Sequence, residues 1–216
     1  MPQQHRPLII AHRGASLEAP ENTLPAFRLA IEAGADGAEF DVRLARDGVP
    51  VVIHDTDLRR VSGRRGEIRD LTSSELAAVD VGTSHHKKRK RLETPSLVGV
   101  GVPTLSEVVD LHSSAGRKMH IELKIEKKRE MVPLVEAVLA VVSSADTLSK
   151  VTISSFFLAA IQEVRRLQPD AVTSALFAPA ILRVLKKRRN MIAIARSFGA
   201  DGISPHRSLV TKKFRS

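Results

Sequence analysis

The sequence predicts an α/β fold built on parallel β-strands. Short apolar runs alternate with amphipathic segments along most of the chain, a pattern typical of repeated strand and helix units. Hydrophobic residues make up 43% of the 216 residues and aromatic residues only 3%, so Ala, Val, Leu and Ile must build the core. A chain of this length fits one large α/β core. We therefore expect a single domain over residues 1–216.

The N-terminal part of the chain predicts a strand, a helix and a hairpin in that order. The turn signal Asp47-Gly48 separates two strand patterns by only a few residues, whereas parallel neighbours need a crossover of a dozen or more. We therefore expect residues 40–54 to form an antiparallel hairpin that extends the second strand. The expected elements are a strand at 8–11, a helix at 20–33 and strands at 36–44 and 49–54.

An irregular segment at residues 57–101 is expected to be an insertion on this scaffold. It is rich in Gly, Ser and basic residues, and it predicts one helix, at 73–79. After it, Thr104 and Glu107 have the spacing of a capping box, which predicts a helix start. The remaining expected elements are strands at 118–123, 151–154, 171–176 and 201–204 and helices at 131–143, 158–167 and 180–198.

The chain is strongly basic, with a formal net charge of +10 and a sequence pI of about 10.4. Such a charge favours an anionic partner, whether a phosphate ester, a nucleic acid or an acidic lipid surface. Much of the charge lies in two runs, residues 85–91 and 186–189, which we interpret as solvated loops or faces. Nucleic-acid binding is disfavoured, because no aromatic residue interrupts either run to stack on bases.

The absence of cysteine excludes disulfides, thiolate metal sites and a cysteine nucleophile. Any metal must therefore be held by oxygen or imidazole ligands. The apolar run near the N-terminus is too short for a secretory signal, and no stretch approaches the 18 uninterrupted apolar residues of a membrane span. We expect a soluble, cytoplasmic protein without a transmembrane segment.

Two histidines fall at expected strand ends, where parallel α/β folds place their sites. His12 ends the first strand and is followed by Arg13 and Gly14, and His54 ends the hairpin beside Asp55. Arg13 supplies a forked, permanent cation for phosphate oxygens. Together these residues indicate a phosphate-handling site. The remaining histidines are expected to be surface or structural residues: His5, His85, His86, His112, His120 and His206.

Pairs of charged residues two positions apart point to the same face of a strand. Glu39 and Asp41 form one such pair, and Glu122 and Lys124 form another. Two adjacent carboxylates repel one another, and a divalent cation removes the cost of burying them. The alternative is that each carboxylate faces solvent beside a Lys or Arg. The nearby histidines favour the metal site.

Six segments, taken in order, resemble the signature of the glycerophosphodiester phosphodiesterase family. The resemblance covers nearly the whole chain. The segments are HRG at 12–14, PENT at 20–23, GADGAEFDVRLARDGVPVVIHD at 34–55, VPTLSEVV at 102–109, IELK at 121–124 and ISSF at 153–156.

This resemblance implies a TIM-type (β/α) barrel that hydrolyses glycerophosphodiesters to sn-glycerol 3-phosphate and an alcohol, in lipid and glycerol metabolism. It implies His12 and His54 as acid and base and Arg13 and Lys124 as phosphate contacts. It also implies a divalent ion, Mg²⁺ or Ca²⁺. The metal ligands would be Glu39, Asp41 and Glu122.

The C-terminal part departs from the family pattern. The Trp-Thr-Val-Asn and Gly-Val-Asp-Gly-Ile-Ile-Thr-Asp runs of the last two strands do not occur, and residues 199–214 match the sixth-strand region. We therefore expect an incomplete barrel that lacks about two strands, with open edges that favour oligomers or aggregation. A truncated chain, a gap filled by a partner or second copy, and a decayed enzyme all remain open explanations.

Two alternatives to the main function follow from this departure. One is a catalytically silent remnant that binds phosphate-bearing ligands or anionic surfaces. The other, among enzymes, is a related phospholipase of the same superfamily, which the PENT and IELK segments fit less well.

Overall fold

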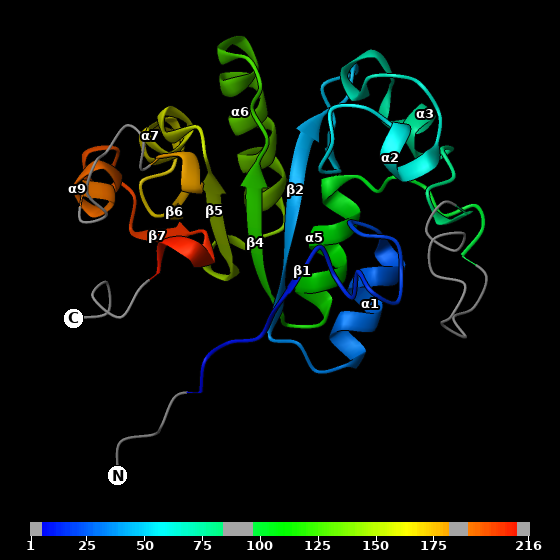
Figure 1. Ribbon diagram of the computed structural model, residues 1–216, viewed down its shortest axis with the longest axis horizontal. Helices are drawn as coiled ribbons and strands as arrows, with labels where there is room; N and C mark the ends of the chain where they lie inside the picture. The colour runs from blue at the N-terminus through cyan, green and yellow to red at the C-terminus, as the bar shows by residue number, and fades with distance from the viewer. Residues whose placement is uncertain (1–5, 84–96, 182–189, 211–216) are drawn as a thin grey trace. The chain divides into compact units, whose positions relative to one another are not determined.

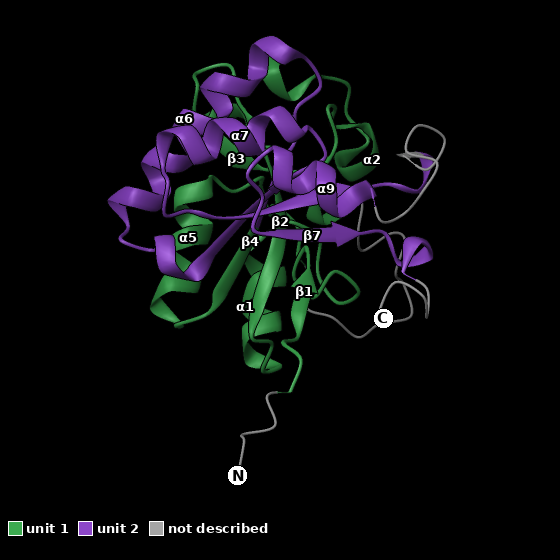
Figure 2. Ribbon diagram, turned by 90° about the vertical axis from the view of Figure 1, so that its left-hand side faces the viewer, with its two compact units in different colours: residues 1–120 green, residues 121–216 purple. Residues whose placement is uncertain are grey.

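The computed structural model describes residues 6–83, 97–181 and 190–210. It divides into two compact units, residues 1–120 and 121–216 (Figure 2). The strands follow the order β1-β2-β4-β5-β6-β7, with β3 paired to β2. The expected α/β class with parallel strands is confirmed.

Unit 1 begins with the expected strand, helix and hairpin. β1 (Ile10–His12) pairs in parallel with β2 (Gly37–Leu44), which places His12 level with Glu39. β2 continues into the antiparallel strand β3 (Pro50–Val52), with Val42 opposite Val52. The turn Asp47-Gly48 between them has Gly48 at φ 77°, a conformation that glycine adopts without cost. The predicted hairpin is confirmed.

The first helix begins later than the sequence pattern indicated. α1 spans Leu24–Glu32, not residues 20–33, because Asn22 has a left-handed backbone at φ 58° and cannot belong to a helix. Thr23 is extended and caps the helix, its side chain accepting from the N–H of Ala26. Residues 20–23 therefore form a loop in front of the helix.

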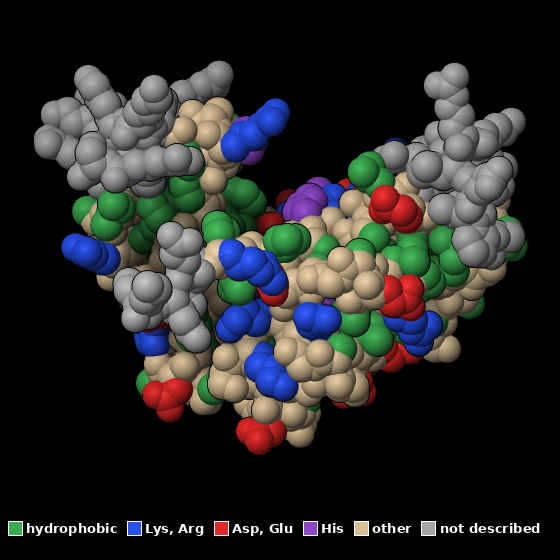
Figure 3. Space-filling view, turned by 90° about the horizontal axis from the view of Figure 1, so that it is seen from below, with side chains coloured by type: hydrophobic (Ala, Val, Ile, Leu, Met, Phe, Trp, Pro, Cys, Tyr) green, Lys and Arg blue, Asp and Glu red, His purple; other side chains and the backbone are tan. Residues whose placement is uncertain are grey.

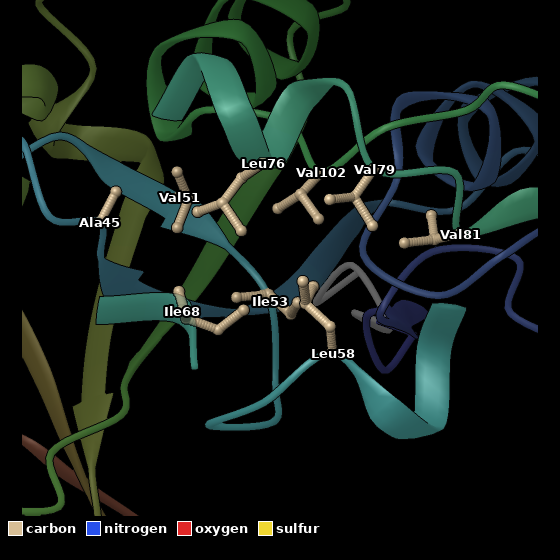
Figure 4. Packing of buried hydrophobic residues seen from close by; sticks show 9 residues of the cluster. All are labelled: Ala45, Val51, Ile53, Leu58, Ile68, Leu76, Val79, Val81 and Val102. Atoms are coloured by element: carbon tan, nitrogen blue, oxygen red, sulfur yellow. The ribbon is translucent and has the colours of Figure 1, made fainter. Parts of the chain in front are cut away.

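The described part of the segment after the hairpin, residues 57–83 and 97–101, has more secondary structure than the one helix that was expected. It contains α2 (Arg59–Ser62), the short 3₁₀ turn η1 (Ile68–Asp70) and α3 (Ser73–Ala77). Figure 4 shows its apolar side chains pointing toward those of the hairpin. The cluster comprises Ala45, Val51, Ile53, Leu58, Ile68, Leu76, Val79, Val81 and Val102. This segment and the hairpin therefore share one hydrophobic cluster.

The end of unit 1 contains a helix with the predicted capping box. α5 (Leu105–Ser114) begins at Thr104, whose hydroxyl accepts from the Glu107 N–H while the Glu107 carboxylate accepts from the Thr104 N–H at 2.8 Å. α5 packs against α1 and β3. β4 (Lys118–Leu123) begins in unit 1, where the Lys118 N–H donates to the Asp36 carbonyl. The strand ends in unit 2.

Unit 2 continues the alternation of helices and parallel strands. β5 pairs in parallel with β6, and β6 with β7. α7 packs on β5, β6 and α6, and α9 packs on β6 and β7 (Figure 1). The bounds are α6 (Lys128–Ser144), η2 (Leu148–Lys150), β5 (Val151–Ser155), α7 (Leu158–Leu167), β6 (Val172–Phe177), η3 (Pro179–Ile181), α9 (Asn190–Ser197), β7 (Gly202–Pro205) and η4 (Arg207–Leu209).

Two expected helices of unit 2 differ from the observed ones. α6 starts at Lys128, three residues early, because the Glu130 carboxylate accepts from the N–H groups of Glu126 and Lys127 and so caps the first turn. The helix expected at 180–198 is observed as η3 and α9, and the residues between them lie outside the described part of the chain.

The surface of the described residues carries charges of both signs. On the face seen in Figure 3, Lys and Arg side chains lie among Asp and Glu side chains. The two basic runs, at 85–91 and 186–189, lie outside the described residues. Among the described helices, none is both long and apolar enough to cross a membrane.

Candidate active site

The first loop of unit 1 turns sharply after β1. His12 is the last residue of the strand, and both Arg13 and Gly14 have left-handed backbones, at φ 60° and 79°. The Arg13 N–H donates to the Glu39 carbonyl at 2.8 Å, which fixes the loop to β2. A Cβ atom on Gly14 would lie 2.7 Å from the backbone of Ala26 in α1, so this position requires glycine. Glycine therefore lets the loop lie directly on the helix.

The PENT segment supplies three polar side chains with three different partners. The Glu21 carboxylate accepts from Arg13 Nη1 at 2.9 Å. Asn22 is buried, and its Nδ2 donates to the Asp41 carboxylate at 2.9 Å. Thr23 caps α1. The segment thus joins the first loop, β2 and the helix start.

The two carboxylates of β2 lie beside the first loop, as their shared face predicts. Asp41 is fully buried, and its Oδ2 lies 3.0 Å from Arg13 Nε. Glu39 Oε2 lies 3.6 Å from His12 Nε2. The alternative of two solvent-facing carboxylates does not describe Asp41, although Asp41 does have an Arg neighbour.

His54 lies just after β3, with its imidazole held by the next residue. Its Nδ1 lies 2.7 Å from the Asp55 carboxylate, and its carbonyl accepts from Arg43 Nε at 2.8 Å. Burial alone would raise the pKa of Asp55, but hydrogen bonds from Arg60 and His54 outweigh it and hold that pKa below its usual value. Asp55 is therefore ionised at neutral pH and orients the ring.

Glu21 is the most strongly perturbed carboxylate of this group. Burial opposes its ionisation, yet the hydrogen bonds and charges of Arg60 and Arg13 lower the pKa of Glu21 to about 2. Arg60 donates to Glu21 at 2.7 and 2.8 Å and to Asp55 at 2.6 and 3.1 Å. The two carboxylates are thus joined by one guanidinium group.

Unit 2 carries the second predicted pair, near the end of β4. Lys124 Nζ lies 2.8 Å from the Glu122 carboxylate, and both side chains are largely buried. The Ser155 hydroxyl of β5 donates to the Leu123 carbonyl at 2.9 Å, which ties the end of β4 to its neighbour. Glu122 and Lys124 therefore lie at the carboxyl end of a strand, as expected.

Three further histidines lie in the described part of the chain. His112 is fully buried against the rings of Phe27 and Phe40, and burial lowers its pKa. Burial likewise lowers the pKa of His120, while His206 is exposed at the start of η4. These positions fit the structural or surface roles predicted for them. His5, His85 and His86 lie outside the described residues.

Three residues of the unit 1 site were not predicted individually: Glu21, Asn22 and Arg60. Glu21 and Asn22 lie in a segment that the sequence marked only as a helix start. Arg60 comes from α2 in the insertion, where many basic residues surround it in the sequence. A pattern of buried carboxylates in need of cations is the only signal that points to it.

Comparison with known proteins gives consistent matches over most of the chain. Residues 12–213 match the Glycerophosphoryl diester phosphodiesterase family. A glycerophosphodiester phosphodiesterase of Caldanaerobacter subterraneus is 34% identical over 79% of this chain and 66% of that protein. A probable glycerophosphodiester phosphodiesterase 1 of Mycobacterium tuberculosis is 33% identical over 92% of this chain and 72% of that protein.

Several solved structures also share the fold of this chain. A putative glycerophosphoryl diester phosphodiesterase from Silicibacter pomeroyi has a TM-score of 0.84 at 29% identity, covering 97% of this chain and 78% of that one. A phosphodiesterase from Oleispira antarctica, solved in complex with the product sn-glycerol-3-phosphate, has a TM-score of 0.81 at 26% identity, covering 95% of this chain and 77% of that one. The chain is a member of the glycerophosphoryl diester phosphodiesterase family.

Proposed function

We propose that the protein hydrolyses glycerophosphodiesters to sn-glycerol 3-phosphate and an alcohol with the help of a divalent metal ion. Family membership supports the reaction class. The Oleispira relative, which binds sn-glycerol-3-phosphate as its product, supports the substrate class. The observation that carries the proposal is the grouping of His12, at the end of β1, with Glu39 and Asp41 on the neighbouring strand β2. His54 and its orienting carboxylate lie in the same unit.

The metal would be held by Glu39, Asp41 and Glu122, each offering one carboxylate oxygen. The pairing of Lys118 with the start of β2 supports this. If that register continues along both strands, Glu122 lies level with Asp41, and level residues of parallel strands point to the same face. Hard cations such as Mg²⁺ and Ca²⁺ prefer such oxygen donors. The ion, when bound, stabilises negative charge that develops on the phosphoryl oxygens.

The two histidines would move the protons of the reaction. One would deprotonate the nucleophile and the other would protonate the departing alkoxide. The nucleophile is either water, which releases sn-glycerol 3-phosphate at once, or the substrate's own glycerol hydroxyl, whose cyclic product water then opens. When His54 Nδ1 donates its proton to Asp55, the lone pair of Nε2 is left to accept or return a proton. His12, with a side chain that is 70% exposed, is accessible to a substrate from solvent.

The phosphate contacts would come from Arg13 and Lys124. Both cations already contact a carboxylate of the proposed metal set, Asp41 for Arg13 and Glu122 for Lys124. Arg13 and Lys124 would each supply a positive charge for phosphate oxygens. Hydrogen bonds between such charged groups are roughly twice as strong as neutral ones.

The decisive experiment is turnover of glycerophosphocholine with Mg²⁺ or Ca²⁺. We expect sn-glycerol 3-phosphate and choline as products, and loss of the reaction in excess chelator. Phosphocholine and glycerol as products would mean that the phosphate ester to glycerol is cleaved, not the ester to choline, and would contradict the proposal. Binding of glycerophosphocholine without turnover would support the silent, phosphate-binding alternative.

A separate experiment tests the metal ligands without requiring turnover. Because hard-cation affinity depends on ligand charge and number, Glu122→Gln should weaken divalent-ion binding in a calorimetric titration. Glu136→Gln is the matched control, because it removes the same charge from an exposed position on α6. Equal affinity of Glu122→Gln and the parent would remove Glu122 from the site.

A further inference from the structure

We propose that Arg60 is a positioning residue that holds the His54 pair and the Arg13 loop in one arrangement, an inference that rests on the proposed function. Arg60 donates hydrogen bonds to two carboxylates. It acts through the two carboxylates, Asp55 and Glu21, between which its guanidinium group lies.

The contacts form an unbroken chain of charged side chains within unit 1. His54 Nδ1 lies 2.7 Å from Asp55, whose two oxygens accept from Arg60 Nε and Nη2. Arg60 Nη1 and Nη2 then donate to the two oxygens of Glu21. The same Glu21 carboxylate also accepts from Arg13 Nη1, at 2.9 Å.

This geometry suits arginine and no other cation. Four hydrogen bonds leave the planar guanidinium group in two bidentate pairs, one to each carboxylate. A lysine ammonium is a point charge and cannot satisfy two carboxylates in this planar way. A guanidinium group so occupied contributes little to binding a phosphate itself. Its effect should therefore fall on the catalytic step.

Arg60 is held in place by the packing beneath α2. Leu58, the residue before the helix, is 1% exposed and belongs to the hydrophobic cluster of the hairpin. The Leu58 N–H donates to the Gly66 carbonyl, and the Ser62 hydroxyl donates back to the Leu58 carbonyl. The packing and backbone hydrogen bonds of Leu58 thus hold α2 and its Arg60 beside the site.

Without Arg60, Asp55 and Glu21 would each lose two charge-assisted hydrogen bonds. Asp55 would then be free to rotate, and the imidazole of His54 would lose its fixed orientation. Misplacement of a catalytic group by about 1 Å can cost on the order of 10²-fold in rate. We therefore expect Arg60→Ala to lower kcat on glycerophosphocholine by about tenfold or more, with a much smaller change in KM.

Arg59→Ala is the matched control for this experiment. Arg59 is the neighbouring residue of α2, is exposed, and pairs with Asp57, outside the chain of contacts. Arg59→Ala should retain parental kcat, and both variants should melt as folded proteins. Addition of millimolar guanidinium should restore part of the kcat of Arg60→Ala, because the small cation can occupy the vacated position. Arg60→Lys should remain impaired.

A spectroscopic readout separates failure of this inference from failure of the proposed function. The imidazole resonances of His54 should shift in Arg60→Ala and remain in place in Arg59→Ala, whether or not the parent turns over substrate. Unmoved His54 resonances would overturn the inference, as would an active parent whose kcat survives Arg60→Ala. An inactive parent with shifted resonances would reject the proposed function and leave the positioning role supported.

Discussion

Replacing Glu21 with Gln should change how the stability of the protein depends on pH. In the folded protein Glu21 accepts from Arg60 and Arg13, and its pKa lies at about 2 rather than the ordinary 4.5. A carboxylate whose pKa is lower in the folded state stabilises the fold when it is ionised. That contribution is fully present above pH 4.5 and is lost as the pH falls toward 2.

The size of this contribution follows from the two pKa values. At about 1.4 kcal/mol for each pH unit between 4.5 and 2, the upper bound is roughly 3 kcal/mol. Because the Glu21 side chain is 24% exposed and Gln keeps part of the hydrogen bonding, we expect a loss of about 1 to 3 kcal/mol at neutral pH. This is a sizeable part of the roughly 5 to 15 kcal/mol of a typical domain.

Urea unfolding at several pH values measures this effect. The difference in unfolding free energy between the parent and Glu21→Gln should be largest from pH 5 to 7 and should disappear near pH 2. Glu18→Gln is the control, since Glu18 lies exposed in the same loop and should show no comparable difference. A parent and a Glu21→Gln variant whose stabilities run parallel from pH 7 to pH 2 would refute the reasoning.

Three further predictions concern the loop, a helix cap and the histidines. Gly14→Ala should lower the unfolding free energy in urea by about 2 to 5 kcal/mol, because the strain of a left-handed backbone adds to a clash with α1. Gly34→Ala, which has the same backbone strain but open space around it, should lower it by only about 1 to 2 kcal/mol. Equal losses in the two variants would contradict the clash. Thr104→Ala should lose about 0.5 to 2 kcal/mol of thermal stability by removing the cap of α5, and an unchanged melt would argue against the cap. His12→Ala and His54→Ala should each lower turnover at least about 10²-fold while metal binding persists, and near-parental turnover in either would remove that residue from the proposed proton transfers.

The sequence predicted those features that depend on local pattern. The alternation of Glu39 and Asp41 placed them on one face, and the Asp47-Gly48 turn predicted the antiparallel hairpin; both are observed. These features follow from a strand period of two and from turn chemistry, which need no knowledge of distant residues. Closure of the barrel depends on strands that pair across the whole chain, so the expected incomplete barrel stays a prediction, as does the single domain.

Features that depend on contacts between distant segments escaped the sequence pattern. Arg60 and Glu21 are 39 residues apart, and nothing in either local sequence indicates that they meet. Within the insertion, the helix predicted at 73–79 is observed as α3. The elements α2 and η1 were hidden, because their few apolar residues lack a clear period. Packing against the hairpin, through residues such as Leu58 and Ile68, and hydrogen bonds within the segment hold them in place.

The order of residues in the PENT segment, 20–23, decides which partner each of its side chains contacts. Asn22 has a left-handed backbone and Thr23 an extended one, at φ −121°. This change of conformation between neighbours aims Glu21 at two guanidinium groups, Asn22 at the buried Asp41 and Thr23 at the helix start. Substitutions at these three adjacent positions should therefore have different effects. Loss of Glu21 leaves Arg13 and Arg60 with one carboxylate fewer, and loss of Asn22 removes a hydrogen bond that holds Asp41. Loss of Thr23 removes the cap of α1. A helix beginning at Pro20 would bring none of these three side chains to its partner, so the loop conformation itself is what the segment encodes.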